Sequence, residues 1–307
     1  MISPVLFEFD SPFPTRPGRI RLLEPPDSSV AVLSERLLRQ DYDKPFIIDS
    51  EGERNLFFDL RYIQSTLCLK TPARLVLPYT RKMMACLLFQ PEPRHMVQIG
   101  MGGGGLTRFC YAHLPQTRIV ALESDPHVFA LREHFLIPPN DVLFRAEAGD
   151  GDAYVRQQAR QVDVLMLDAF DREGIAPAFT RPDFLVAARD CLSGDGMLVI
   201  NLTGDLNRCQ QLLNAAETAF GGRLLLLRVG KASNYILFAF RNPFFRPHWP
   251  TLKAQAQRLE ILYELPLRED ALALEQAART GFRRLWRLAC GMGLRDSGLP
   301  RGPVSIF

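Results

Sequence analysis

The sequence predicts an α/β fold with a doubly wound, mainly parallel sheet, preceded by a small domain of β-strands and followed by helices. Three observations support this prediction. Short apolar runs alternate with helical patterns between residues 78 and 241. A glycine-rich turn follows the first of these runs, and acidic residues end the later ones. Ligands of doubly wound sheets bind at the carboxyl ends of the strands, so the sequence indicates a Rossmann-like ligand-binding fold.

Composition excludes several classes of protein. Of the 307 residues, 47% are hydrophobic and 23% are charged, which is typical of globular domains and not of a disordered chain. No run reaches the ~18–20 apolar residues of a membrane helix. Six cysteines occur without a CxxC motif, and the N-terminus has no basic leader, so we expect reduced thiols, a cytoplasmic protein and no metal site. We interpret the excess of arginine in residues 241–307 as a solvated helix face and not as a nucleic-acid surface.

Four segments follow one another along the chain. Residues 1–30 are rich in proline and have no clear periodicity, which predicts an irregular lead-in. Residues 31–77 predict a β-strand domain, with strands in VAVLSERLL, PFIIDS, NLFFDL, STLCLK and ARLVL. Residues 78–241 predict the Rossmann-like catalytic domain, and residues 242–307 a helical extension.

Within the third segment, continuous apolar runs predict strands that are buried on both faces. We expect strands at 95–100, 118–123, 142–147, 162–168 and 197–202, with an antiparallel hairpin in GRLLLLRV and NYILFAF at one edge. Helices are expected at 78–89, up to 113 after the glycine turn, and at 126–136, 152–160, 181–192 and 205–219.

The glycine turn joins the first of these strands to a helix. Gly100, Gly102 and Gly105 satisfy G-x-G-x-x-G, and Gly103 and Gly104 lie between them. Without Cβ atoms, these residues let the backbone approach a cofactor at a helix N-terminus. A purely structural turn is the alternative interpretation.

Acidic residues end the next three strands. Glu123 lies about twenty residues after the glycine turn, where a carboxylate can accept hydrogen bonds from both ribose hydroxyls of an adenosyl group. Asp150, followed by Gly151, can accept a hydrogen bond from an adenine amino group, and the fourth strand ends in Asp168 and, three residues later, Asp171. Helix or turn capping could explain Asp150 or Asp171 alone. The series as a whole favours a cationic cofactor and a cationic substrate.

Six stretches carry a resemblance to a known family: FFDLRYIQS, Tyr79 ahead of a helix, IGMGGGG, ALESD, AGDGDAY and LDAFDREGIAPAF-TRPDF. Over about residues 35–241, the chain resembles the spermidine/spermine synthase (polyamine aminopropyltransferase) family, and most closely its bacterial spermidine synthase-like branch. The resemblance implies a sheet of the S-adenosylmethionine-dependent methyltransferase type. It also implies transfer of an aminopropyl group from decarboxylated S-adenosylmethionine to an amine such as putrescine, with release of methylthioadenosine. A homodimer is a further implication.

The resemblance also implies roles for single residues. Asp168 matches the catalytic acid, while Asp171 and Tyr79 match residues that hold the amine; Tyr235 is a candidate beside them. The residues expected to bind the cofactor are Gln64, Gly100, Gly102, Gly103, Gly104, Glu123, Asp150 and Gly151.

The chain departs from the family at several positions. Gly103 stands where the family's glycine loop usually has an aspartate, Arg172 replaces a proline, and a Tyr-Pro-x-Gly stretch before the last strand is missing. Three alternatives therefore stay open: a methyltransferase that uses S-adenosylmethionine, a protein that binds an adenosyl ligand without catalysis, and an NAD(P)-dependent oxidoreductase. Retention of both Asp168 and Asp171 favours an amine substrate.

Overall fold

The computed structural model describes residues 3–171, 174–203, 206–230, 234–282 and 286. The chain forms two compact units and passes between them several times. The first unit comprises Met1–Leu77, Gly100–Pro115 and Ile119–Asp150, and the second comprises Pro78–Ile99, Gln116–Arg118 and Gly151–Phe307. These units cut across the four segments expected from the sequence, because neither unit is continuous along the chain.

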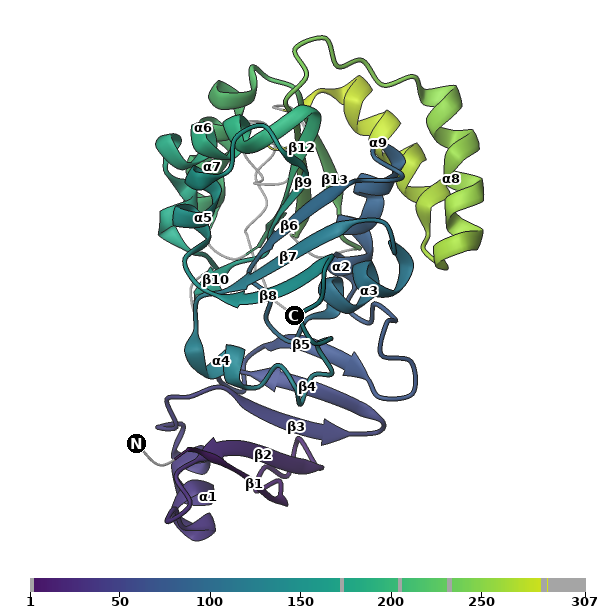
Figure 1. The fold of residues 1–307 in the computed structure, drawn as a ribbon. Coiled ribbons are helices and arrows are strands. Elements are labelled where there is room, and N and C mark those ends of the chain that lie inside the picture. The colour runs from purple at the N-terminus through teal and green to yellow at the C-terminus, as the bar shows by residue number, and fades with distance from the viewer. Residues whose placement is uncertain (1–2, 172–173, 204–205, 231–233, 283–285, 287–307) are drawn as a thin grey trace, which may run out of the picture. The chain divides into compact units, whose positions relative to one another are not determined.

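An antiparallel sheet dominates the first unit (Figure 1). Residues 1–30 are not an irregular lead-in: they contribute the first two strands of this sheet. Ile20 and Leu22 alternate with exposed or half-buried residues, and the prolines of this segment lie outside both strands. The proline content therefore masked a period-two pattern. The strands, in sheet order, are β1 (Val5–Asp10), β2 (Arg19–Glu24), β3 (Phe46–Ser50), β4 (Glu53–Phe57) and β5 (Ile63–Cys68).

Two strands expected within residues 31–77 are absent. VAVLSERLL forms the helix α1 (Val30–Arg39), in which Leu33 and Leu37 bury one face at the i, i+4 spacing of a helix. Both pack into a core that includes Phe46 and Phe57 of the sheet. The stretch ARLVL at 73–77 adopts turns and irregular backbone.

The rest of the first unit is a parallel strand pair with two helices. β7 (Arg118–Glu123) pairs with β8 (Phe144–Ala148). α3 (Gly105–His113) follows the glycine turn, and α4 (Pro126–Ala130) is capped by Asp125, whose side chain accepts bonds from His127 N and Val128 N. α4 is shorter than the expected helix over 126–136, and the backbone turns left-handed at Leu136.

A mixed sheet with strand order β13-β14-β12-β9-β6 forms the centre of the second unit. β6, β9 and β12 are parallel, while β14 runs antiparallel to both β12 and β13. The expected antiparallel hairpin at one edge is confirmed. The bounds are β6 (His95–Ile99), β9 (Val162–Leu167), β12 (Leu192–Leu202), β13 (Leu224–Arg228) and β14 (Tyr235–Phe240).

Helices cover both faces of this sheet (Figure 1). α5, α6 and α7 pack together on one face, while α2, η1, α8 and α9 lie on the other. The helix expected over 78–89 is split into an α-helix and a 3₁₀ segment. The helices are α2 (Pro78–Met83), η1 (Met84–Leu88), α5 (Gly151–Gln157), η2 (Pro177–Thr180), α6 (Pro182–Cys191), α7 (Leu206–Phe220), α8 (Trp249–Tyr263) and α9 (Leu267–Thr280); the short strands β10 (Phe170–Asp171) and β11 (Gly174–Ile175) form a hairpin.

In the described part of the chain, no helix is long and apolar enough to cross a membrane. No group of three or more His, Cys, Asp or Glu side chains in that part could hold a metal ion.

Candidate active site

The glycine turn begins at the residue after β6 and adopts a conformation that glycine favours. Gly100, Gly102 and Gly104 have positive φ angles of 84°, 53° and 67°. Gly100 N and Met101 N both donate to Leu122 O, each at 3.0 Å. A Cβ on Gly104 would lie 1.8 Å from Ile137 Cδ1, so its neighbours also exclude a side chain there. The turn is therefore fixed by its hydrogen bonds to β7 and by close packing.

Glu123, at the end of β7, lies directly against this turn. Its Oε2 accepts a hydrogen bond from Gly102 N at 2.9 Å, and its Oε1 accepts one from Asp125 N at 3.0 Å. The residue is 8% exposed. Burial raises the pKa of the carboxyl group, although the two N–H bonds oppose that shift. A buried carboxylate beside a glycine turn can accept hydrogen bonds from hydroxyl groups of a ligand.

Gln64 occupies a β-bulge in β5. Leu56 pairs with Ser65 and Phe57 pairs with Ile63, which leaves Gln64 as the extra residue between them. Bulges re-aim side chains and are frequent beside active sites. The next residue, Ser65, accepts a hydrogen bond from Gly103 N at 2.9 Å, so β5 contacts the glycine turn within the first unit.

Gly103 leaves no room for a side chain. A Cβ on it would lie 2.7 Å from Ser65 Cβ and 2.9 Å from Phe135 Cδ1. The aspartate that the family usually carries there would require both neighbours to move. The departure from the family pattern at Gly103 therefore matches its surroundings in this chain.

Arg108 of α3 bonds the glycine turn through Gly103 O. This residue was not identified from the sequence. The residue is 4% exposed; its Nε donates to Pro72 O at 2.8 Å, and its Nη1 donates to Phe135 O at 2.6 Å and to Gly103 O. Burial lowers the pKa of the guanidinium to about 10. A buried cation that bonds three backbone carbonyls is a structural clamp on the glycine turn.

Asp150 and Gly151 follow β8 in the sequence. Asp150 is exposed. Gly151 is buried at the start of α5, where a Cβ would lie 2.4 Å from Ile99 Cγ2. The close approach of α5 to the end of β6 therefore requires glycine.

Asp168 follows β9 and is held on two sides within the second unit. Its Oδ1 accepts a hydrogen bond from Asn201 Nδ2 at 2.9 Å, and its side chain accepts another from the Tyr79 hydroxyl. The pKa of Tyr79 is raised well above its usual value, first by burial and then by the charge of Asp168 and their hydrogen bond. Since Asn201 is 3% exposed, its amide is fixed, and it orients the Asp168 carboxylate. Asn201 was not identified from the sequence as a candidate site residue. A polar residue inside the apolar run MLVINL would have indicated it.

The two remaining substrate candidates lie near strand ends. Asp171 ends the short strand β10, and its side chain lies outside the described structure. Tyr235 begins β14 and pairs with Leu202, the neighbour of Asn201. Its ring packs against Trp286, with centroids 6.1 Å apart.

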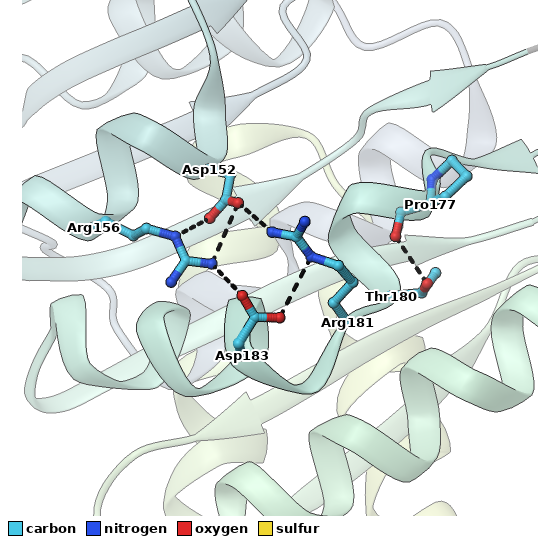
Figure 2. A network of polar contacts seen from close by, with 6 residues as sticks. All are labelled: Asp152, Arg156, Pro177, Thr180, Arg181 and Asp183. Atoms are coloured by element: carbon cyan, nitrogen blue, oxygen red, sulfur yellow. Dashed lines mark hydrogen bonds and ion pairs between the residues drawn. The ribbon is translucent and has the colours of Figure 1, made fainter.

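A network of ion pairs links α5 to the start of α6 (Figure 2). Asp152 accepts hydrogen bonds from Arg156 Nε and Arg181 Nη2, both at 2.7 Å. Arg156 also donates to Asp183 at 2.8 Å. Burial alone would raise the pKa of Asp183, but the arginines outweigh it and the pKa is lowered. The network anchors the segment that follows Gly151 to the segment that follows β11.

Comparisons with known proteins support these observations. No protein-family model matches the chain. A polyamine aminopropyltransferase of Chromobacterium violaceum is 33% identical over 231 residues, which cover 75% of this chain and 88% of that protein. A spermidine synthase solved in complex with the transition-state analogue AdoDATO is 18% identical with a TM-score of 0.60, over 82% of this chain and 86% of that chain. Human methyltransferase-like protein 13, solved in complex with SAH, is 24% identical with a TM-score of 0.56. The match covers 62% of this chain and 94% of that chain.

The structural likenesses bear on the fold. They confirm the α/β fold of the S-adenosylmethionine-dependent methyltransferase type, with an N-terminal β-domain and C-terminal helices. The sequence likeness extends over most of a curated relative and confirms the predicted resemblance. The chain belongs to the polyamine aminopropyltransferase family, a family of transferases.

Proposed function

We propose that the protein transfers an aminopropyl group from decarboxylated S-adenosylmethionine to a diamine such as putrescine and releases methylthioadenosine. The arrangement of Asp168 carries this proposal: a carboxylate at a strand end, oriented by the Asn201 amide and the Tyr79 hydroxyl. A general base must be held in one orientation if it is to accept a proton from an incoming amine.

The residues around the glycine turn and at the ends of β7 and β8 are the candidates for the adenosyl end of the co-substrate. Glu123 would accept hydrogen bonds from the ribose hydroxyls, and Asp150 would accept one from the adenine amino group. The residues Gly100, Gly102, Gly103, Gly104 and Gly151 would let the backbone approach the ligand, with Gln64 reaching it from its bulge. The burial of Glu123 beside Gly102 supports this assignment.

Asp168 and the residues near it are the candidates for the amine. A primary amine with a pKa of about 10 is protonated at neutral pH and cannot attack until it loses a proton. Asp168 would accept that proton, and the freed nitrogen lone pair would attack the carbon beside the sulfonium. The new C–N bond forms as the C–S bond breaks, and sulfur leaves as the neutral thioether of methylthioadenosine. Asp171, Tyr79 and Tyr235 would hold the amine.

The test is an assay with purified protein, decarboxylated S-adenosylmethionine and a panel of diamines, with methylthioadenosine measured by mass spectrometry. We expect release that depends on one amine and falls about 10²–10⁴-fold in Asp168→Asn. Asp190→Asn, which removes an exposed carboxylate from the end of α6, is the matched control and should keep its activity. Asp168→Asn with normal turnover would refute the assignment of the base.

Methyl transfer is the second candidate. The likeness to a methyltransferase solved with SAH supports it at the level of the fold. The same assay with S-adenosylmethionine distinguishes the two reactions, because methyl transfer releases S-adenosylhomocysteine and needs no decarboxylated co-substrate. If neither product forms while methylthioadenosine still binds, the protein is a ligand-binding homologue without catalysis.

We also propose that the protein is a cytoplasmic homodimer that pairs through its N-terminal β-domain. The five described cysteines form no disulfide, and burial raises the pKa of both Cys110 and Cys191 to about 12, as in unreactive core thiols. Light scattering should give twice the mass of the chain, whereas a monomer would contradict the dimer.

A further inference from the structure

A buried ion pair joins the C-terminal helix α9 to α2. Asp270 has no exposed surface, and the Lys82 side chain is 12% exposed. Lys82 Nζ bonds Asp270 Oδ1, and it also lies 3.5 Å from Glu269 Oε1. Glu269 differs from its neighbour because its side chain is 78% exposed. The lysine therefore has one buried and one solvated carboxylate as partners.

Stability alone does not explain this pair. Burial raises the pKa of the Asp270 carboxyl group to about 6, against the opposing effect of Lys82, and Oδ2 accepts no hydrogen bond from any residue that the structure describes. Ion pairs of this kind cost desolvation energy, and apolar replacements are often neutral or stabilising. A buried polar group with an unsatisfied oxygen calls for another explanation, such as a role in fixing a geometry.

The C-terminal helices make a second contact, with η1, which directly follows α2 in the chain. Gln255 Nε2 of α8 donates to Leu87 O at 3.2 Å and to Leu88 O at 3.1 Å, at the end of η1. The continuous segment α2–η1 is thus bound near its middle, where Asp270 holds Lys82, and at its end, where Gln255 holds Leu87 and Leu88. The two C-terminal helices fix how this segment lies on the sheet.

The segment α2–η1 carries Tyr79, whose hydroxyl bonds Asp168. Tyr79 lies three residues before Lys82 in a helix of six residues, so a displacement of Lys82 displaces Tyr79 as well. We propose that Asp270 is a positioning residue: through Lys82 it holds α2 in the orientation that keeps the Tyr79 hydroxyl on Asp168. This inference rests on the proposed function of Asp168 and assigns the C-terminal helices to the amine half of that reaction.

The experiment compares Asp270→Asn with Glu269→Gln, which removes the exposed carboxylate from the same lysine. We expect Asp270→Asn to lower kcat about tenfold and to leave the Kd for methylthioadenosine unchanged, while Glu269→Gln changes kcat less than twofold. In a Tyr79→Phe background, Asp270→Asn should cost less than twofold, because coupled residues are not additive. Equal losses in both backgrounds, or equal losses in the two carboxylate variants, would overturn the proposal.

A readout without turnover separates this inference from the proposed function. With 3-fluorotyrosine at position 79, the ¹⁹F resonance should shift in Asp270→Asn and not in Glu269→Gln, whether or not any amine is a substrate. If Asp270→Asn does not fold, the double variant Lys82→Met/Asp270→Leu replaces the pair with apolar side chains. Normal kcat or an unshifted ¹⁹F resonance in the folded variant would refute the role of Asp270. Absence of turnover in the unmodified protein, with the ¹⁹F shift present, would refute only the proposed function.

Discussion

Asn201 determines how the Asp168 carboxylate is presented. Its buried amide donates to Asp168 Oδ1 at 2.9 Å, so Asn201→Leu should lower kcat on the order of tenfold or more through loss of a hydrogen bond to a charged group. Asn201→Asp should act differently. Two carboxyl groups at that distance do not ionise independently, and one pKa rises. We therefore expect the acidic limb of the kcat profile in Asn201→Asp to move to higher pH, measured by methylthioadenosine release. An unmoved limb would show that Asp168 does not titrate in the reaction.

Gly103 and Gly105 form a matched pair for a stability test. Gly103→Ala places a Cβ within 3 Å of Ser65 and Phe135, so we expect a loss of about 1–3 kcal/mol in the free energy of unfolding. Nothing lies within 4 Å of a Cβ on Gly105, at the start of α3, so Gly105→Ala should be neutral or slightly stabilising. Urea unfolding of both variants measures the difference. Equal stabilities would mean that the Ser65 and Phe135 side chains move aside for the new methyl group at little energetic cost.

At the scale of elements, the ion-pair network between α5 and α6 should be sensitive to salt. The Arg156 and Arg181 side chains are 41% and 51% exposed, so each pair contributes about 1 kcal/mol or less. Arg181→Gln should lower the melting temperature at low ionic strength, and the difference should vanish near 1 M salt, where charges are screened beyond about 3 Å. Arg39→Gln, which removes an exposed pair on α1, is the control. If the lower melting temperature of Arg181→Gln persists at high salt, the Arg181 side chain stabilises the protein through packing and not through its charge.

The sequence predicted the elements that have a continuous apolar run. It did not predict those in which residue preference and hydrophobic spacing favour different structures. The buried strands β6, β9 and β14 appear where apolar runs predicted them, because each run is buried almost throughout. α1 was misread because its β-branched valines favour strands, while the spacing of Leu33 and Leu37 favours a helix.

The candidate site residues also differ in how far the sequence reveals them. Asp168 and Glu123 could be proposed from the sequence because Glu123 ends one apolar run and Asp168 directly follows another. Asn201 and Arg108 act on partners far away in the sequence, and only the folded structure shows those contacts.

At the scale of the whole molecule, Asp270 makes stability depend on pH in a defined direction. Its pKa rises from 3.8 to about 6 on folding, with Lys82 of α2 and with Glu260 of α8 and Glu269 as the charges around it. Between these values the unfolded state loses its proton first, so this group lowers the free energy of unfolding as pH rises from about 4 to about 6.

Asp270→Asn removes that titration. The melting temperature of Asp270→Asn relative to the unmodified protein should therefore increase between pH 4 and pH 7, as measured by calorimetry. A constant difference across this range would mean that Asp270 does not titrate there. A variant that gains relative stability at neutral pH and still loses turnover would separate positioning from folding.

The N-terminal hairpin has a consequence for the handling of the protein. β2 pairs with β3 through Ile20–Ile48 and Arg21–Ile47, and β3 carries Phe46, Ile47 and Ile48. Removal of residues 1–30 would leave β3 as an open edge of unpaired backbone groups flanked by bare apolar side chains, which is a template for aggregation. Such a truncation should therefore lower the yield of unaggregated protein, whatever its effect on catalysis.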